Sequence, residues 1–201
     1  AQRGWGRTAP NPMVGAVVVR DGVVVGEGWH AEYGGPHAEV MALGAAGDRA
    51  RGAEVYVTLE PCAHFGNTPP CADALLEAGV QRVVVAIEDP NAEAHGGNAR
   101  LRAAGVEVVT GVEAEAAHEL NAPWLFSVSG AERPFVTLKL ALSIDGAIAP
   151  GGGAQRWLTG PLARRQVHKL RANADAVAVG IGTVLTDDPQ LTVRAGRRPR
   201  A

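Results

Sequence analysis

Three metal-binding side chains and one carboxylate fall within a single stretch of the chain. His37 is followed 25 positions later by Cys62 and nine positions after that by Cys71, and these are the only two cysteines. One imidazole and two thiolates suit a catalytic Zn²⁺, because they leave its fourth tetrahedral position open for water. Glu39 is the natural proton carrier for that water, whose pKa zinc lowers towards neutrality. These residues predict a hydrolytic zinc site.

The spacing narrows the chemistry but leaves alternatives. A His-x-Glu pair followed by Pro-Cys-x-x-Cys is typical of zinc nucleobase deaminases, whereas here eight residues separate the cysteines. Two cysteines are also often inert core residues, or the zinc could be structural with His64 as its fourth ligand. Neither cysteine lies in an apolar run, however. Each follows a proline: Cys71 opens a predicted helix, and Cys62 falls at a predicted chain reversal. If both lie at helix N-termini, the dipole there favours thiolates.

Composition excludes several classes of partner. The chain of 201 residues is 46% apolar and 20% charged, as in ordinary globular proteins, and its net charge is only −2. Such a charge gives no reason to expect nucleic acid or a membrane surface, and no apolar run reaches the roughly 20 residues of a membrane helix. Composition alone leaves open whether the chain forms a homo-oligomer. Cysteines placed as metal ligands fit the reducing cytoplasm.

Alternating elements are expected to position these residues. Arg20-Asp21-Gly22 between two valine-rich runs predicts a hairpin of strands 13–19 and 23–29. Further strands are predicted over 54–59, 82–87 and 106–109, and helices over 37–46, 72–78, 98–104 and 113–120. This order indicates one mixed sheet with helices on its faces. Catalytic loops then belong at strand ends, where Glu60-Pro61-Cys62 falls.

A second unit is predicted from residue 133. Strands are expected over 134–143 and 176–182, a glycine turn at 151–153, and a helix over 161–172. About 70 residues are few for an α/β domain with its own core. Residues 1–8 read as the end of a helix, and the basic residues from Arg194 onward read as a loop. We therefore expect a fragment with a first domain over 1–122 and an incomplete second domain over 133–201.

Longer motifs carry a family resemblance. They are Pro10-Asn11-Pro12-Met13-Val14-Gly15, Gly34-Gly35-Pro36-His37-Ala38-Glu39, Thr58-Leu59-Glu60-Pro61-Cys62, Gly66-Asn67-Thr68-Pro69-Pro70-Cys71, Asp89-Pro90-Asn91, Ser143-Ile144-Asp145-Gly146, Trp157-Leu158-Thr159-Gly160 and the run from Asp187 to Arg194. In these motifs the chain resembles the bacterial bifunctional deaminase/reductases of riboflavin biosynthesis. The resemblance covers nearly the whole chain, and the long insertion before Cys71 separates it from ordinary cytidine deaminases.

The resemblance implies an α/β fold and two activities. A cytidine-deaminase-like three-layer α/β/α domain would remove the 2-amino group of 2,5-diamino-6-(5-phosphoribosylamino)pyrimidin-4(3H)-one. The start of a dihydrofolate-reductase-like α/β domain would follow, and the full-length protein would reduce the ribosyl chain with NADPH. In the deaminase, His37, Cys62 and Cys71 would hold Zn²⁺ and Glu39 would carry protons. Around the substrate the resemblance places Asn11, His30, Asp89 and Asn91.

Reductase positions follow from the same resemblance. Those expected to contact NADPH are Ala141, Trp157, Thr183 and Asp187. Those expected to contact the sugar phosphate are Arg171, Leu191 and Arg194. From the residues alone, Trp157 and Leu191 would read as core and Arg171 as a helix cap. We expect this chain to deaminate but not to reduce, because its second domain looks incomplete.

Three departures from the family pattern bear on substrate binding. Asn67 stands where the family usually has a basic residue, Ala92 where it has a second proline, and Gln155 where it has a serine. They put the grip on the phosphate in question and leave the zinc chemistry untouched. The alternative function is a zinc deaminase of another aminopyrimidine, of guanine or of a tRNA base. A tRNA-editing enzyme should show a basic face, which this composition lacks.

Overall fold

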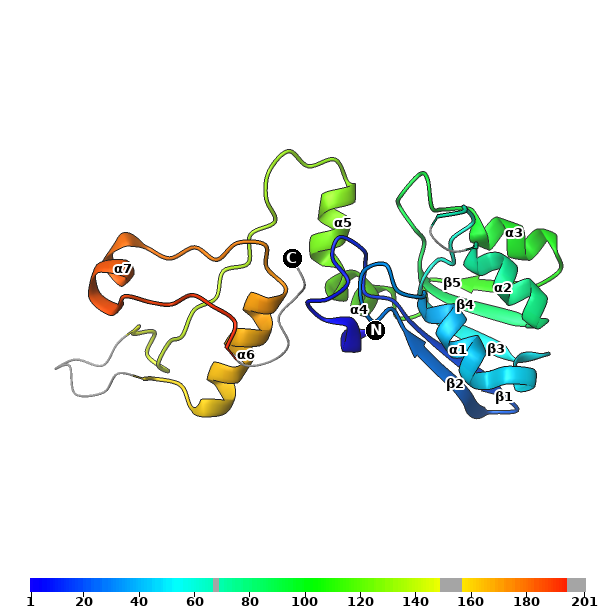
Figure 1. The fold of residues 1–201 in the computed structure, drawn as a ribbon, viewed down its shortest axis with the longest axis horizontal. Coiled ribbons are helices and arrows are strands. Elements are labelled where there is room, and N and C mark those ends of the chain that lie inside the picture. Colours follow the sequence, from blue (N-terminus) through cyan, green and yellow to red (C-terminus); the bar gives the residue numbers. More distant parts are fainter. Residues whose placement is uncertain (67–68, 149–156, 195–201) are drawn as a thin grey trace. The chain divides into compact units, whose positions relative to one another are not determined.

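The computed structural model describes residues 1–66, 69–148 and 157–194 (Figure 1). Contacts divide the chain into unit 1, Ala1–Pro134, and unit 2, Phe135–Ala201. The expectations for Asn67, Gln155, the 151–153 turn and the basic residues after Arg194 fall outside the described residues. In the described part of the chain, no helix has the length and apolar character that crossing a membrane requires.

Unit 1 holds one sheet and most of the helices. Its elements are η1 (Gln2–Gly4), β1 (Gly15–Arg20), β2 (Val23–Trp29), α1 (Ala38–Ala46), η2 (Gly47–Ala50), β3 (Glu54–Leu59), α2 (Cys71–Ala78), β4 (Arg82–Ile87), α3 (Gly97–Ala103), β5 (Glu107–Thr110), α4 (Ala114–Leu120) and α5 (Ala122–Val128). The predicted hairpin is confirmed as β1 and β2. Asp21 and Gly22 turn the chain with φ of 52° and 76°, the conformation that the favoured two-residue hairpin turn requires.

The sheet brings three strand ends to one edge. Its order is β2-β1-β3-β4-β5, with β1 antiparallel to both β2 and β3, and with β3, β4 and β5 mutually parallel. Strands β2, β3 and β4 therefore run in the same direction. His30 and Glu60 directly follow β2 and β3, and Asp89 lies two residues after the end of β4, so all three emerge at the same edge, as expected for catalytic loops.

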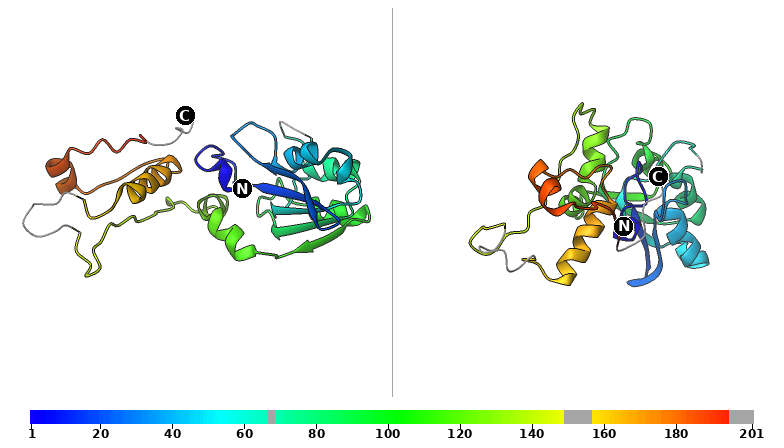
Figure 2. Two further views of the ribbon diagram at one scale, coloured as in Figure 1. Left: turned by 90° about the horizontal axis from the view of Figure 1, so that it is seen from below. Right: turned by 60° about the vertical axis from the view of Figure 1, so that its left-hand side comes forward.

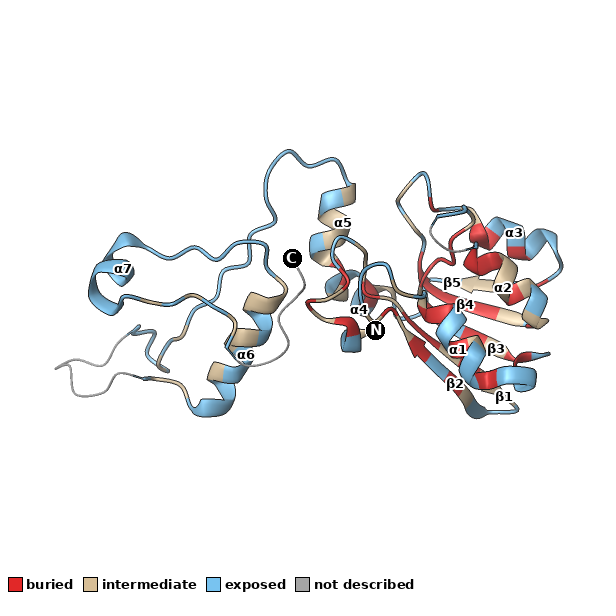
Figure 3. Ribbon diagram, viewed as in Figure 1, coloured by how far each residue is buried: buried red, intermediate tan, exposed pale blue. Residues whose placement is uncertain are grey.

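Helices cover both faces of the sheet. Helices α1, α2 and α3 share one face, and the main core between them and the sheet contains Val18, Val55, Leu75 and Leu101. On the other face, Ala117 of α4 joins a second cluster that α5 also contacts. Buried residues gather between these layers in unit 1 (Figure 3). The predicted three-layer α/β/α arrangement is confirmed.

Two glycines of β2 allow α1 to lie unusually close to the sheet. A Cβ added to Gly28 would lie under 3.0 Å from three atoms of α1, and a Cβ at Gly26 would collide with the next turn of that helix. The opposing helix face consists of Ala38, Ala42 and Ala46, all buried. Small residues on both elements thus fix the position of the first turn of α1 relative to the end of β2.

The chain after α4 differs from expectation. The sequence predicted a helix ending at residue 120 and none between it and residue 133, but α5 begins at once and carries Pro123 in its first turn. Between the two helices, Asn121 is buried and pairs with the backbone of Met13. Its Oδ1 accepts from the Met13 N–H at 2.8 Å and its Nδ2 donates to the Met13 carbonyl at 3.0 Å. The helix end predicted over residues 1–8 is only the short turn η1.

Unit 2 contains two described helices, α6 (Pro161–Ala172) and α7 (Ile181–Asp187), of which α6 was predicted (Figure 2). The strands predicted over 134–143 and 176–182 are wrong, since no described residue of this unit lies in a strand. Leu138, Leu140 and Val179 are exposed in these segments. Apolar β-prone residues form a strand only when a neighbouring strand takes up their backbone hydrogen bonds, and the described residues offer none here.

Candidate metal and substrate site

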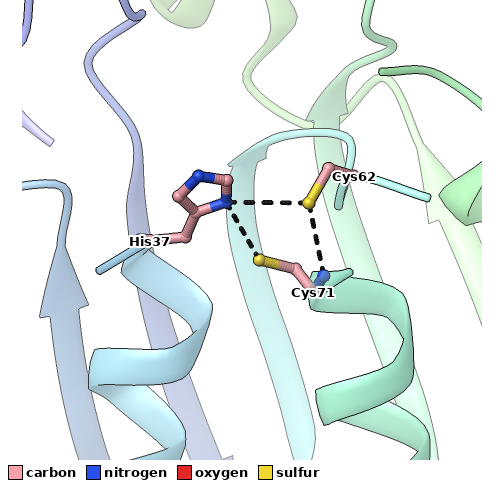
Figure 4. A group of neighbouring side chains, drawn as sticks. All are labelled: His37, Cys62 and Cys71. Atoms are coloured by element: carbon pink, nitrogen blue, oxygen red, sulfur yellow. Dashed lines mark hydrogen bonds between the residues drawn. The ribbon is translucent and has the colours of Figure 1, made fainter. Parts of the chain in front are cut away.

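The three predicted metal ligands converge at the sheet edge (Figure 4). His37 is the N-cap of α1, Cys71 is the first residue of α2, and Cys62 lies in the loop after β3. The His37 Nδ1 atom lies 3.2 Å from the Cys71 Sγ and 3.6 Å from the Cys62 Sγ. All three ligand atoms lie within 4.8 Å of one another, and both cysteines are free thiols.

This donor set fits a zinc ion. Ligand atoms around a tetrahedral zinc with two sulfurs and one nitrogen lie roughly 3.5–3.8 Å apart, close to the separations found here. Among the described residues, no further histidine, cysteine or carboxylate joins the group as a fourth ligand. His64 instead lines the neighbouring cavity. A site with three protein ligands leaves one position for water, as catalytic zinc sites do.

The two cysteines differ in their relation to α2. Cys71 begins α2 as predicted, whereas Cys62 lies in the loop after β3, so the condition that both lie at helix N-termini is met by Cys71 alone. The Sγ of Cys62 nevertheless accepts the backbone N–H of Cys71 at 3.3 Å, so the first turn of α2 acts on it too. Hydrogen bonds with the Cys71 thiol and then with His37 lower the pKa of Cys62 to about 4. The same pairing raises the pKa of the Cys71 thiol.

Glu39 lies beside this group in the first turn of α1. Its side chain is only 3% exposed, and burial raises the pKa of its carboxyl to about 7. A carboxyl whose pKa lies near the working pH can both accept and release a proton. Glu39 lines the same cavity as His37 and Cys62. Its position is therefore suited to move protons between a metal-bound water and a ligand.

A cavity of about 470 Å³ opens in front of these residues. Its volume lies in the usual range for small-molecule sites. The four predicted substrate contacts, Asn11, His30, Asp89 and Asn91, all line it. The structure therefore brings together residues from the loop before β1, the end of β2 and the loop after β4.

One wall of the cavity contains a short hydrogen-bonded chain. The His30 Nδ1 lies 3.1 Å from the Pro36 carbonyl, so it carries the proton and donates it, and Nε2 lies 3.2 Å from the Asn11 Nδ2 and accepts from it. Burial lowers the pKa of His30, which keeps this neutral form in place. Both ring nitrogens are thereby used within the protein, and the oxygen of the Asn11 amide faces away from His30.

The opposite wall is a loop shaped by its own side chains. The Asp89 Oδ1 accepts the Asn91 N–H at 2.8 Å, and the Asn91 Oδ1 accepts the Glu93 N–H at 3.1 Å. Burial raises the pKa of Asp89. Ala92 is exposed at the tip of this loop. Two successive side-chain turns of this kind restrict the backbone that presents Asp89 and Asn91.

Some cavity residues were missed at the sequence level. Tyr33, Trp124 and Val128 line the cavity, the last two from α5. The available signal was Pro123, because proline is favoured in the first turn of a helix. The side chain of Asn121 would usually cap such a helix, but here it bonds to Met13 instead. Capping preferences, which depend on neighbouring residues alone, could not predict this bond to a distant residue.

In unit 2 the predicted reductase residues are only partly gathered. Arg171 donates to the Thr192 carbonyl at 3.3 Å, and the Arg194 N–H donates to His168 Nδ1 at 3.3 Å, so residues 191–194 run alongside α6. Thr183 and Asp187 share α7 and are exposed. Trp157 is 52% exposed beneath the Arg164 guanidinium, so its interpretation as a core residue is wrong. Ala141 and Leu191 are half-buried.

Comparison with known proteins covers both units. The family model of the cytidine and deoxycytidylate deaminase zinc-binding region matches residues 1–87, and that of the RibD C-terminal domain matches residues 134–201. Riboflavin biosynthesis protein RibD of Aquifex aeolicus is 53% identical over 96% of this chain and 54% of its own length. The Escherichia coli protein of the same name is 51% identical over 96% and 53%.

Solved structures give the same relationship. A diaminohydroxyphosphoribosylaminopyrimidine deaminase/5-amino-6-(5-phosphoribosylamino)uracil reductase from Thermotoga maritima has a TM-score of 0.87 at 47% identity. The match covers 99% of this chain and 58% of that one. Acinetobacter baumannii RibD has a TM-score of 0.81 at 50% identity, over 96% and 55%. The chain thus spans about half the length of the relatives it matches, and it belongs to the RibD family of riboflavin biosynthesis proteins.

Proposed function

We propose that this chain catalyses the zinc-dependent hydrolytic deamination of 2,5-diamino-6-(5-phosphoribosylamino)pyrimidin-4(3H)-one in riboflavin biosynthesis. One observation carries the proposal: an imidazole, two cysteine sulfurs and a buried carboxyl with a raised pKa meet beside the cavity. The Thermotoga relative, whose name contains this deaminase activity, supports the choice of substrate.

Each residue at the centre has a distinct task. His37, Cys62 and Cys71 would hold Zn²⁺, which when bound acidifies a water and so supplies the nucleophile at neutral pH. Glu39 accepts the proton of that water and delivers it to the ring nitrogen next to the amine-bearing carbon. Once the water oxygen has bonded to that carbon, Glu39 takes the second proton of the water and passes it to the amino group, which leaves as ammonia while the carbonyl forms. A carboxyl with a pKa of about 7 can serve in both directions.

The cavity walls are assigned to the substrate. Asn11 would present its amide oxygen to the ligand, since its NH₂ group faces His30. Asp89 and Asn91 would contact the pyrimidine or its ribosyl phosphate from the opposite loop. Trp124 and Val128 supply the apolar wall, which suits a planar ring. Two free, buried cysteines used as ligands support a place in the reducing cytoplasm.

We further assign residues 1–122 to the deaminase domain, with α5 completing its cavity, and residues 133–201 to the reductase. The match of residues 134–201 to the RibD C-terminal domain supports the second assignment. In the whole protein this dihydrofolate-reductase-like domain would reduce the ribosyl chain with NADPH. Ala141, Trp157, Thr183 and Asp187 would contact the cofactor, and Arg171, Leu191 and Arg194 the sugar phosphate.

The test is ammonia release by the purified, zinc-loaded chain. The diaminopyrimidinone ribosyl phosphate, cytidine, deoxycytidylate and guanine are offered in parallel at equal concentrations. We expect rapid release from the first compound and little from the others. Faster release from cytidine or guanine would overturn the substrate assignment while keeping the deaminase chemistry. No release from any of the four would refute the proposed function.

A further inference from the structure

Glu60 is a buried carboxylate that the deamination chemistry leaves without a role. It follows β3 directly, its side chain is 7% exposed, and it accepts three backbone N–H groups. Its Oε2 accepts from Asp89 at 3.1 Å, and its Oε1 accepts from Gly96 at 3.0 Å and from Asn98 at 2.9 Å. A carboxylate is costly to bury unless such donors satisfy it, and hydrogen bonds to a charged acceptor are about twice as strong as neutral ones.

The three donors all belong to the chain from the end of β4 into the first turn of α3, residues 88–98, here called the 88–98 segment. Asp89 lies at its beginning, and Gly96 and Asn98 lie at its end. One side chain therefore ties both ends of a loop to the same point. The loop between those ends carries Asn91, which with Asp89 lines the cavity.

The residues that follow Glu60 also contact the 88–98 segment. Gly97 lies against Pro61, and a Cβ added to Gly97 would overlap the Pro61 carbonyl. The Ala63 N–H donates to the Ala94 carbonyl at 3.1 Å. The 88–98 segment thus contacts Glu60, Pro61 and Ala63 at its two ends and at Ala94, and it has little freedom to shift as long as Glu60 holds its amides.

The zinc ligand in this stretch has supports of its own. The Cys62 Sγ accepts the Cys71 N–H at 3.3 Å, and the Cys62 carbonyl accepts the Ala72 N–H at 3.2 Å. Both bonds come from α2 and neither involves the 88–98 segment. Loss of the Glu60 carboxylate should therefore release Asp89 and Asn91 while leaving Cys62 in place.

We propose that Glu60 is a positioning residue for substrate binding, which fixes Asp89 and Asn91 through the three backbone amides of the 88–98 segment. The inference rests on the proposed function, in which Asp89 and Asn91 contact the substrate. Glu60 lies at the cavity but is not one of the three grouped metal ligands, and backbone N–H groups occupy both of its carboxylate oxygens. Its effect should appear in KM, because the groups it holds bind the substrate without taking part in proton transfer.

The decisive variant is Glu60→Gln, with Val83→Ala as a matched control. The glutamine amide keeps the shape of the side chain but turns an NH₂ group towards backbone N–H groups, so the segment must move. KM for the diaminopyrimidinone phosphate should rise about tenfold or more, since weakening the hydrogen bonds that Asp89 and Asn91 make to the substrate costs on the order of a factor of ten in affinity. Turnover at saturation and zinc content should stay near wild type. Val83 is fully buried near the start of β4 and pairs with Val55, so its truncation loosens the core away from the cavity edge.

A double-mutant cycle separates positioning from general damage. In the Asn91→Ala background, Glu60→Gln should raise KM far less than it does in the wild type, because the group it positions is gone. Effects that multiply in full would overturn the proposal, as would loss of zinc or a fall in kcat that matches the change in kcat/KM. In the control cycle, whatever effect Val83→Ala has on KM should be the same in the Asn91→Ala background as in the wild type.

Amide hydrogen exchange gives a readout that needs no substrate. Glu60→Gln should accelerate exchange of the Asp89, Gly96 and Asn98 amides well beyond any change caused by Val83→Ala. Unchanged exchange at these amides would refute the positioning role even if the substrate assignment were wrong. If Glu60→Gln does not fold, Gly97→Ala displaces the same segment from the Pro61 side and should raise KM in the same way. A wild-type KM in that variant would contradict the proposal.

Discussion

Gly28→Ala should disable the site by pushing the first turn of α1 away from β2. A Cβ at this position would overlap the Ala38 carbonyl and the Ala42 N, and would lie 2.8 Å from the Met41 Cβ. Because ordinary contacts of this kind lie at 3.4–4 Å, the first turn of α1 must retreat by about 1 Å. Ala38 lies between His37 and Glu39, so both would move with it. Such overpacking typically costs about 1–3 kcal/mol of unfolding free energy.

Activity should suffer more than stability. A misplacement of about 1 Å can reduce turnover by about 100-fold, and here it affects both a metal ligand and the proton carrier. The assay combines the urea midpoint, zinc content and ammonia release. Gly44→Ala is the matched control, because this exposed glycine of the same helix has open space where a Cβ would stand. The unfolding free energy of this variant should rise by up to about 1 kcal/mol, and its turnover should be unchanged. Full activity in Gly28→Ala would refute the account of how α1 is positioned.

Three further predictions concern the metal, pH and the cofactor. Cys71→Ser should lose most of the one Zn²⁺ expected per chain, because a hydroxyl is a much poorer ligand than a thiolate, and full occupancy by metal analysis would contradict the ligand set. Burial lowers the pKa of His30 below its ordinary 6.5, so its neutral form contributes stability that is complete above that value and declines as pH falls. In the zinc-loaded protein, the stability advantage of wild type over His30→Gln should therefore shrink between about pH 7.5 and 5.5, and a constant difference in urea midpoints would argue against it. This chain should not oxidise NADPH with the deaminated product, because Trp157, Thr183 and Asp187 are exposed and no described residue of unit 2 forms a strand; micromolar NADPH binding in a titration would show otherwise.

Local signals predicted most of unit 1. Asp21-Gly22 between valine runs predicted the hairpin, and the strands over 54–59 and 82–87 were predicted with the bounds they have. The metal-binding group was also visible in the sequence, since His37 and Cys71 stand where the helices α1 and α2 begin. In each case neighbouring residues decide the conformation, so a pattern along the chain suffices.

What the sequence could not provide depends on partners far along the chain. The Cys62 sulfur accepts the Cys71 N–H at the start of α2 only because the fold brings them together. The pairing of Asn121 with Met13 spans 108 positions. The role of Glu60 appears only when the segment after β4 returns to it. In unit 2 it is the lack of a partner among the described residues that explains the wrong prediction. The segments over 134–143 and 176–182 have the composition of strands, but strand formation requires a neighbour to pair with.

The role of Glu39 as the proton carrier can be tested with Glu39→Gln. The variant keeps the size of the side chain but cannot carry a proton, so zinc content should stay at about one per chain while ammonia release from the diaminopyrimidinone phosphate falls by roughly 10²–10⁴-fold. Zinc and ammonia are measured on the same samples of wild type and variant. Wild-type turnover in the zinc-loaded variant would contradict the assignment of Glu39 as the proton carrier, and loss of zinc would show that Glu39 supports the metal instead.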